Sequence, residues 1–189
     1  MTESRFGLTE LDDLPDDVRE RIGETARKSG FVPNIFRALG HRPAELRAFL
    51  DYHDALMERD EGLSKAEREL VVVATSGANH CTYCIVAHGA ILRIRSKDPH
   101  LADQVAASPW QAELEPRARA IADLALALAR TPEHFGDADI EAARSAGLTD
   151  DEIWDVGAIT ALFAASNRLA HLTALQPNPE FYLMGRLPR

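Results

Sequence analysis

Three observations predict an all-α fold. The chain of 189 residues is 46% hydrophobic but only 6% aromatic, and its many Ala and Leu residues suit close-packed helices better than sheets. Apolar residues recur at steps of three and four, which is the period of an amphipathic helix. Two Ser/Thr-x-x-Glu capping boxes, at 64–67 and 149–152, precede long apolar segments. We expect one domain over 1–189, with 1–13 as a loose N-terminal segment.

Three helices are predicted in the first third of the chain, over 15–29, 31–40 and 43–59. Pro suits the first turn of a helix and Gly suits its end, and these residues bound the first segment. In the third segment His53 falls on the apolar face. A histidine there is usually a hydrogen-bonded core residue, so we keep it only as a candidate for the lining of a pocket.

A fourth helix begins at the capping box of Ser64 and Glu67. The β-branched run Val71–Val73 would also suit a strand, but the capping box and the lack of turn residues favour a helix. Glu69 stands at the edge of this apolar run. It either pairs with Lys65 one turn earlier on the surface or faces the cysteines that follow, and the sequence leaves both options open.

Five further helices are predicted, over 81–95, 98–110, 115–130, 137–146 and 153–175. The last is apolar on most sides but is interrupted by Asn167, Arg168 and His171. Because buried polar groups need partners, these side chains either reach a pocket or subunit contact, or pack with local hydrogen bonds. The matching Leu-Ser/Thr-x-x-Glu segments hint at two related helical halves.

The two cysteines of the chain, Cys81 and Cys84, form a Cys-x-x-Cys pair with His88 four residues later. A helical turn of about 100° per residue places the three side chains within an arc of roughly 60°. A cysteine near a helix N-terminus and a base has a lowered pKa, so its thiolate forms near neutral pH. Two thiols one turn apart can also close a disulfide.

Other uses of the pair fit the sequence less well. A structural zinc site needs four ligands, and the chain has no second Cys-x-x-Cys or His-x3-5-His pair. Covalent haem attachment needs a histidine directly after the second cysteine, where Ile85 stands. The first residues lack the apolar segment of an export signal. A redox-active dithiol remains, although the flanking helical pattern differs from the βαβ context of thioredoxins.

Glu69, Cys81, Cys84 and His88 together resemble the Glu-x11-Cys-x-x-Cys-x3-His signature of the alkylhydroperoxidase D family, within the carboxymuconolactone decarboxylase superfamily. The segments 32–34, 167–170 and 179–186 look like its subgroup of uncharacterised peroxidase-related enzymes.

The resemblance implies an all-helical homo-oligomer that acts as a dithiol peroxidase and is reduced by an external dithiol or disulfide-carrying partner. It implies that Cys84 attacks the hydroperoxide, that Cys81 resolves the product, and that His88 with Glu69 relays protons. No cofactor is expected beyond the redox-active disulfide Cys81–Cys84.

One residue departs from the family pattern. Well-studied members have a histidine between the cysteines, where this chain has Tyr83, and a tyrosine with a pKa near 10 is no base at neutral pH. His80, directly before Cys81, is one candidate to replace that imidazole. Two alternative functions stay open, a lyase of the carboxymuconolactone decarboxylase type and a non-enzymatic module that senses redox state or holds zinc.

The charge of the chain narrows its partners. A formal net charge of −9, with no basic run, argues against nucleic acid and against anionic membranes. No apolar run reaches the roughly 20 residues that span a bilayer. We expect a cytoplasmic protein, whose thiols are kept reduced.

Overall fold

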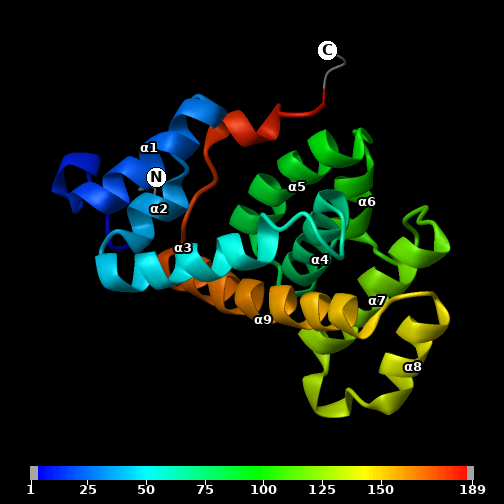
Figure 1. The fold of residues 1–189 in the computed structure, drawn as a ribbon. Helices are drawn as coiled ribbons and strands as arrows, with labels where there is room; N and C mark the ends of the chain where they lie inside the picture. The colour runs from blue at the N-terminus through cyan, green and yellow to red at the C-terminus, as the bar shows by residue number, and fades with distance from the viewer. Residues whose placement is uncertain (1–3, 187–189) are drawn as a thin grey trace.

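The computed structural model describes residues 4–186, and these confirm the all-α class (Figure 1). No strand occurs in that range. Nine α-helices follow one another: α1 Asp16–Ser29, α2 Asn34–Leu39, α3 Pro43–Met57, α4 Lys65–Ala78, α5 Thr82–Ser96, α6 Leu101–Ala107, α7 Pro116–Arg130, α8 Asp137–Ser145 and α9 Asp150–Thr173. Short 3-10 helices cover Leu11–Asp13, Pro132–His134 and Pro179–Tyr182.

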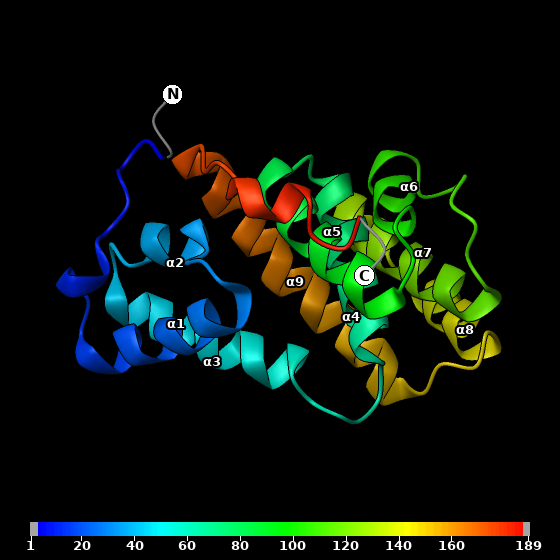
Figure 2. The same ribbon diagram turned by 90° about the horizontal axis from the view of Figure 1, so that it is seen from above.

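Helix α4 lies at the centre of the fold, in contact with α5, α6, α7 and α9. Every residue from Arg68 to Gly77 is buried, and the run Val71–Val73 is helical. Helices α1 to α3 gather at one side of the molecule, while α6 to α8 lie at the other (Figure 2). The long helix α9 passes along both groups, so α4 and α9 together form the frame on which the other helices pack.

The prediction of a loose N-terminal segment is wrong for residues 4–13, and its residues 1–3 lie outside the described range. The backbone N–H of Arg5 donates to the carbonyl of Thr173 at 2.7 Å, and that of Thr9 donates to Arg37 at 3.0 Å. Ser4 is buried. These bonds tie the segment to the ends of α9 and α2, which the polar composition of the segment did not reveal.

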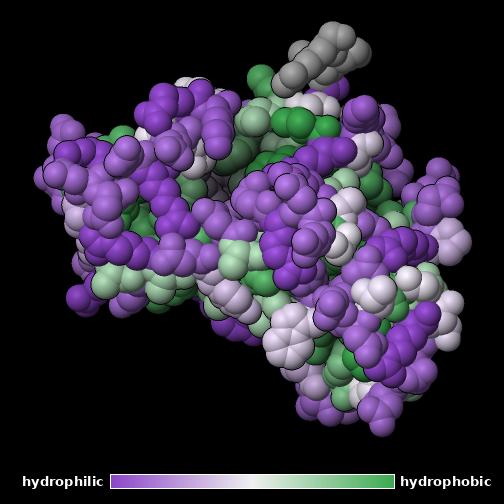
Figure 3. Space-filling model, viewed as in Figure 1, coloured by the Kyte–Doolittle hydropathy of each residue, from purple (hydrophilic) through white to green (hydrophobic). Residues whose placement is uncertain are grey.

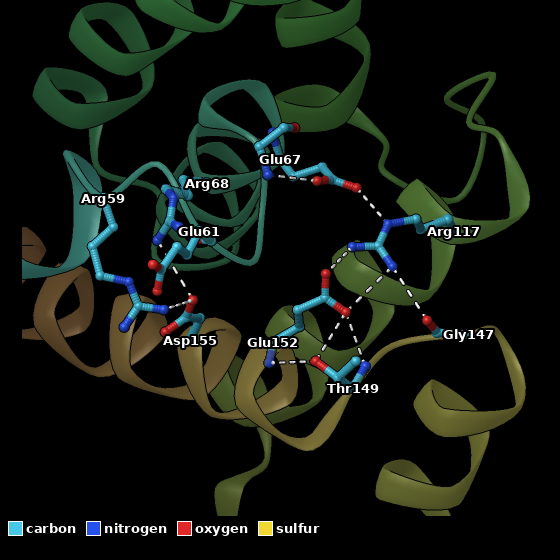
Figure 4. A network of polar contacts seen from close by, with 10 residues as sticks. Arg59, Glu61, Glu67, Arg68, Arg117, Gly147, Thr149, Glu152 and Asp155 are labelled. Carbon is cyan, nitrogen blue, oxygen red and sulfur yellow. Dashed lines mark hydrogen bonds and ion pairs between the residues drawn. The ribbon is translucent and has the colours of Figure 1, made fainter.

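Both predicted capping boxes are formed, Ser64 with Glu67 and Thr149 with Glu152. A single side chain joins them (Figure 4). Arg117 of α7 donates from Nε to Glu67 at 2.7 Å and from Nη2 to Glu152 at 2.5 Å. The pKa of Glu152 is lowered, chiefly by its hydrogen bond from Arg117. The starts of α4 and α9 are thus fastened to α7.

A second polar cluster in Figure 4 has a buried centre, made by Arg68 and Asp155. Arg68 is fully buried and donates to the carbonyls of Leu56 and Glu61. Its guanidinium lies 3.5 Å from Asp155 of α9, whose carboxylate also accepts a 2.8 Å bond from Arg59. Burial raises the pKa of Asp155 and lowers that of Arg68. The cluster fixes the loop between α3 and α4 against α9.

The face of the molecule seen in Figure 3 is mostly hydrophilic, as the net charge of −9 leads one to expect. Within residues 4–186, no helix combines the length and the apolar character required to cross a bilayer. That the chain consists of two related helical halves, as the matching Leu-Ser/Thr-x-x-Glu segments suggest, stays a prediction.

Candidate functional site

The site is built on the sharp turn that joins α4 to α5. His80 adopts a left-handed conformation, with a φ of 53°. The chain then turns back so that the backbone N–H of Cys81 donates to the carbonyl of Ser76 at 2.9 Å. Cys81 is the N-cap of α5, and Cys84 lies in its first turn. The turn therefore presents both thiols at the start of a helix that packs along α4.

The two cysteines are free thiols with different surroundings. Each is only 2% exposed, and both belong to an apolar cluster with Ala170 and Phe181. Cys81 lines a pocket of about 230 Å³ at the surface. Cys84 does not line this pocket, and its sulfur lies 3.9 Å from the hydroxyl of Ser166 on α9. Cys81 is accordingly the sulfur that meets a molecule entering the pocket.

The two thiols shift one another's pKa in opposite directions. The pKa of Cys81 is lowered to about 6, first by a hydrogen bond from the Cys84 thiol and further by the Cys84 backbone N–H and the charge of His171. The pKa of Cys84 is raised well above its usual value by the same pairing with Cys81 and by burial. The pairing therefore favours a single thiolate, with the lowered pKa on Cys81 and the raised pKa on Cys84.

Glu69 faces the dithiol helix, which resolves the choice that the sequence left open. It is 2% exposed, and its Oε2 lies 2.8 Å from Nδ1 of His88. Its other oxygen, Oε1, lies 3.3 Å from the guanidinium of Arg95. Lys65 pairs instead with Glu58. A carboxylate only accepts hydrogen bonds, so Nδ1 of His88 carries the shared proton and Nε2 is left as the basic nitrogen.

The ring of His88 is held on a second side by Phe163, edge to face, with 4.6 Å between centroids. His53 also packs edge to face with Phe163, with 6.3 Å between centroids, and its Nδ1 is 3.0 Å from Asp54. It is half-buried and stacks on Phe49. The structure thus places His53 beside the ring that supports His88 and among the residues of α3, apart from the sulfurs.

Asn167 forms a buried polar link beneath the cysteines. It is fully buried, donates to the hydroxyl of Ser76 at 3.1 Å and accepts from Asn79 at 3.0 Å. Its amide also favours the thiolate of either cysteine and lowers both pKa values. Asn167, which interrupts the apolar surface of α9, therefore finds its hydrogen-bond partners at the end of α4, next to the two cysteines.

Of the remaining candidate residues, two line the pocket of Cys81 and one does not. His171 lines the pocket with Cys81, and Tyr83 does so as well. The hydroxyl of Tyr83, however, accepts the backbone N–H of Ile35 at 3.1 Å. His80 is exposed and does not line that pocket. Of His80 and His171, only His171 lines the same pocket as Cys81.

Several contacts within the site were not identified from the sequence. Arg95 holds Glu69, Ser166 contacts Cys84, and Ser76 binds Asn167. Arg95 had a signal, because it follows His88 by seven residues, or two helical turns, and so lies on the same face of α5. The two serines had none, since nothing in a single sequence pairs α4 with α9.

No group of three or more His, Cys, Asp or Glu side chains within residues 4–186 is arranged to hold a metal ion.

The family model described as "Carboxymuconolactone decarboxylase family" matches residues 43–109. A comparison with curated proteins found no match. The alkylhydroperoxidase AhpD core of an uncharacterised peroxidase-related protein from Ralstonia eutropha is 54% identical, covers 100% of both chains and superposes with a TM-score of 0.97.

An uncharacterised peroxidase-related protein from Silicibacter is 35% identical over 98% of this chain and 97% of that one, with a TM-score of 0.91. The debrominase Bmp8 shares the fold, with 16% identity over 95% and 93% of the two chains and a TM-score of 0.78. The fold and its buried dithiol define an AhpD-like protein. The chain belongs to the AhpD-like group of the carboxymuconolactone decarboxylase superfamily.

Proposed function

We propose that the protein is a dithiol peroxidase, which reduces hydroperoxides through Cys81 and Cys84 and is reduced again by an external dithiol. One observation carries the proposal. Two buried sulfurs lie one helical turn apart at the start of α5, and His88, about one turn further along that helix, is paired with the buried carboxylate of Glu69 on α4. This arrangement supplies a thiolate, a second thiol and a base.

The relatives support a peroxidase-related function in general terms. The proteins from Ralstonia eutropha and Silicibacter are both described as peroxidase-related, and neither has a characterised reaction. The substrate and the reductant are therefore proposed from the family resemblance and from the chemistry of the site.

The proposed cycle has three steps. The Cys81 thiolate attacks the terminal oxygen of the hydroperoxide, the O–O bond breaks, and the alkoxide leaves with a proton as an alcohol. The sulfur is oxidised to a sulfenic acid. Cys84 then gives its proton to His88 and attacks the Cys81 sulfur, so that water leaves and a disulfide forms. An external dithiol returns two electrons and two protons and leaves as a disulfide.

The order of attack differs from the one that the family resemblance implies, in which Cys84 reacts first. The lowered pKa of Cys81 and its place at the pocket support Cys81 as the first nucleophile. The raised pKa and the burial of Cys84 suit a thiol that reacts only after His88 removes its proton.

Hydroperoxide consumption with dithiothreitol as the donor tests the function. We expect turnover by the wild type and loss of at least about 100-fold in Cys81→Ser and in Cys84→Ser, with the double serine variant as the chemical blank. Equal consumption by all four proteins would refute the proposal, and zinc bound in stoichiometric amount to the purified protein would support the zinc-holding module instead.

Trapping with dimedone, a reagent for sulfenic acids, tests the order. After one equivalent of hydroperoxide, we expect label on Cys81 in the Cys84→Ser variant. Label on Cys84 in the Cys81→Ser variant, with none in the reciprocal variant, would establish the order that the resemblance implies.

A further inference from the structure

Tyr83, which stands where the family has a histidine between the cysteines, is not placed to transfer protons in this protein. Tyr83 is 3% exposed, and its hydroxyl accepts the backbone N–H of Ile35. Burial raises the pKa of Tyr83 further above its usual value. The side chain instead fastens α5 to α2. A proton-exchanging group for Cys81, the thiol that lines the pocket, must therefore come from elsewhere in the fold.

His171 of α9 meets the requirements for such a group. It lines the pocket that Cys81 lines, and it is exposed to solvent. Its neighbour Ala170 belongs to the apolar cluster around both cysteines. An imidazole in this position shares a pocket with the Cys81 thiol and contacts bulk water, so it can pass protons between the two.

The orientation of the His171 ring follows from its hydrogen bond. Nε2 lies 2.9 Å from the backbone carbonyl of Asn79, two residues before Cys81. A carbonyl only accepts, so Nε2 carries a proton and donates it. Nδ1 has no hydrogen-bond partner among residues 4–186 and is the nitrogen left to exchange a proton. The ring is thus held by the same turn that positions the thiol.

We propose that His171 is the acid–base partner of Cys81, in the role that the family's histidine between the cysteines would otherwise have. The protonated ring stabilises the Cys81 thiolate and gives its proton to the alkoxide that leaves when the peroxide O–O bond breaks. It regains a proton from solvent. The catalytic part of this assignment rests on the proposed peroxidase function, whereas the effect on thiolate formation does not.

Other ionisable groups face Cys81 and must be separated from His171. Arg5 lines the pocket from the N-terminal segment and donates from Nη1 to the carbonyls of His171 and Leu172. Cys84 contributes from α5, as described above, and Tyr83 stays neutral. The pocket is lined by no Asp or Glu among the residues that the structure describes. Arg5 and His171 are therefore the two positive groups to compare.

The test measures alkylation of Cys81 by iodoacetamide as a function of pH, in a Cys84→Ser background so that one thiol reacts. Adding His171→Gln, whose amide retains a donor for the Asn79 carbonyl, should move the midpoint of the reaction upward by about half a pH unit or more. The matched control is His80→Gln, an exposed imidazole directly before Cys81, which should leave the midpoint unchanged. Thermal unfolding of each variant checks that the fold is kept.

The inference is overturned if His171→Gln leaves the midpoint in place, or if only Arg5→Gln moves it. Hydroperoxide turnover is read separately. A protein that consumes no hydroperoxide refutes the peroxidase proposal, while the alkylation profile still decides the thiolate assignment. A rate loss in His171→Gln that is largest at low pH and shrinks as the pH rises is the expected result, because at high pH the wild-type ring has also lost its proton and the Cys81 thiolate forms in both proteins. A loss equal at every pH would contradict that role.

Discussion

The variant Glu69→Gln tests the most specific feature of the site. The carboxylate is 2% exposed and accepts from His88 at 2.8 Å while it faces Arg95 at 3.3 Å. Glutamine keeps the shape but turns one oxygen into a donor. To avoid two donors facing each other, the amide must donate to Nδ1 of His88. The proton of the neutral ring then lies on Nε2, which is no longer basic.

Two magnitudes follow. Hydrogen bonds to charged groups contribute about 1.5–3 kcal/mol, and the amide retains part of one of them, so we expect a loss of about 1–3 kcal/mol in the free energy of unfolding. For a chain of this size that corresponds to about 2–12 °C in Tm. Loss of the base should lower turnover by roughly 10²- to 10⁴-fold. Because His88 serves the second step, sulfenic acid should accumulate on Cys81.

Urea unfolding, hydroperoxide turnover and dimedone labelling measure the three effects. Glu58→Gln is the matched control, because Glu58 also contacts Arg95, at 3.5 Å, but its side chain is 50% exposed. Its free energy of unfolding should stay within about 0.5 kcal/mol of the wild type. If Glu69→Gln turns over hydroperoxide like the wild type, the carboxylate–imidazole pair has no part in the reaction and our reasoning fails.

Three further predictions concern single contacts. Tyr83→Phe should cost about 1–3 kcal/mol in chemical unfolding, because the α2 N–H loses its acceptor, while turnover changes less than about twofold; a large rate loss would return Tyr83 to the relay. Cys84→Ala should shift alkylation of Cys81 to higher pH, since the largest influence lowering the Cys81 pKa is removed; an unchanged profile would contradict the coupling. Arg117→Met should destabilise by about 1–2 kcal/mol above about pH 5. This loss should shrink as the pH falls through the lowered pKa of Glu152, because protonation of Glu152 removes that contact in the wild type as well. Urea unfolding at several pH values measures it, and a difference between variant and wild type that is the same at every pH would contradict the prediction.

Much of the fold was predictable because local signals agreed with one another. Pro15 and Gly30 bound α1 as expected, with Pro15 as its N-cap and Gly30 in the left-handed conformation at its end. Both capping boxes form where the sequence placed them. Helix starts and ends depend on neighbours in the chain, so their signals are complete within a few residues.

Contacts between distant segments were less predictable. Glu69 and His88 were identified through a family signature, but the sequence left Glu69 undecided between the surface and the interior. Arg117 bridges the starts of α4 and α9 from a third helix, and no local pattern marks such a residue. His80 was a candidate because it is adjacent to Cys81 in sequence, yet the left-handed turn leaves it exposed.

Several expectations stay predictions. They are the homo-oligomer, the cytoplasmic location, the absence of nucleic-acid and membrane partners, and the absence of a cofactor other than the Cys81–Cys84 disulfide.

Helix α4 has a consequence for how the protein opens. All residues from Arg68 to Gly77 are buried, so this helix has no side from which it can fray into water. Its amide protons should therefore exchange with deuterium only when the whole domain unfolds. Because Glu69 and the backbone acceptor of Cys81 belong to this buried stretch, we expect these two supports of the site to persist until the domain unfolds.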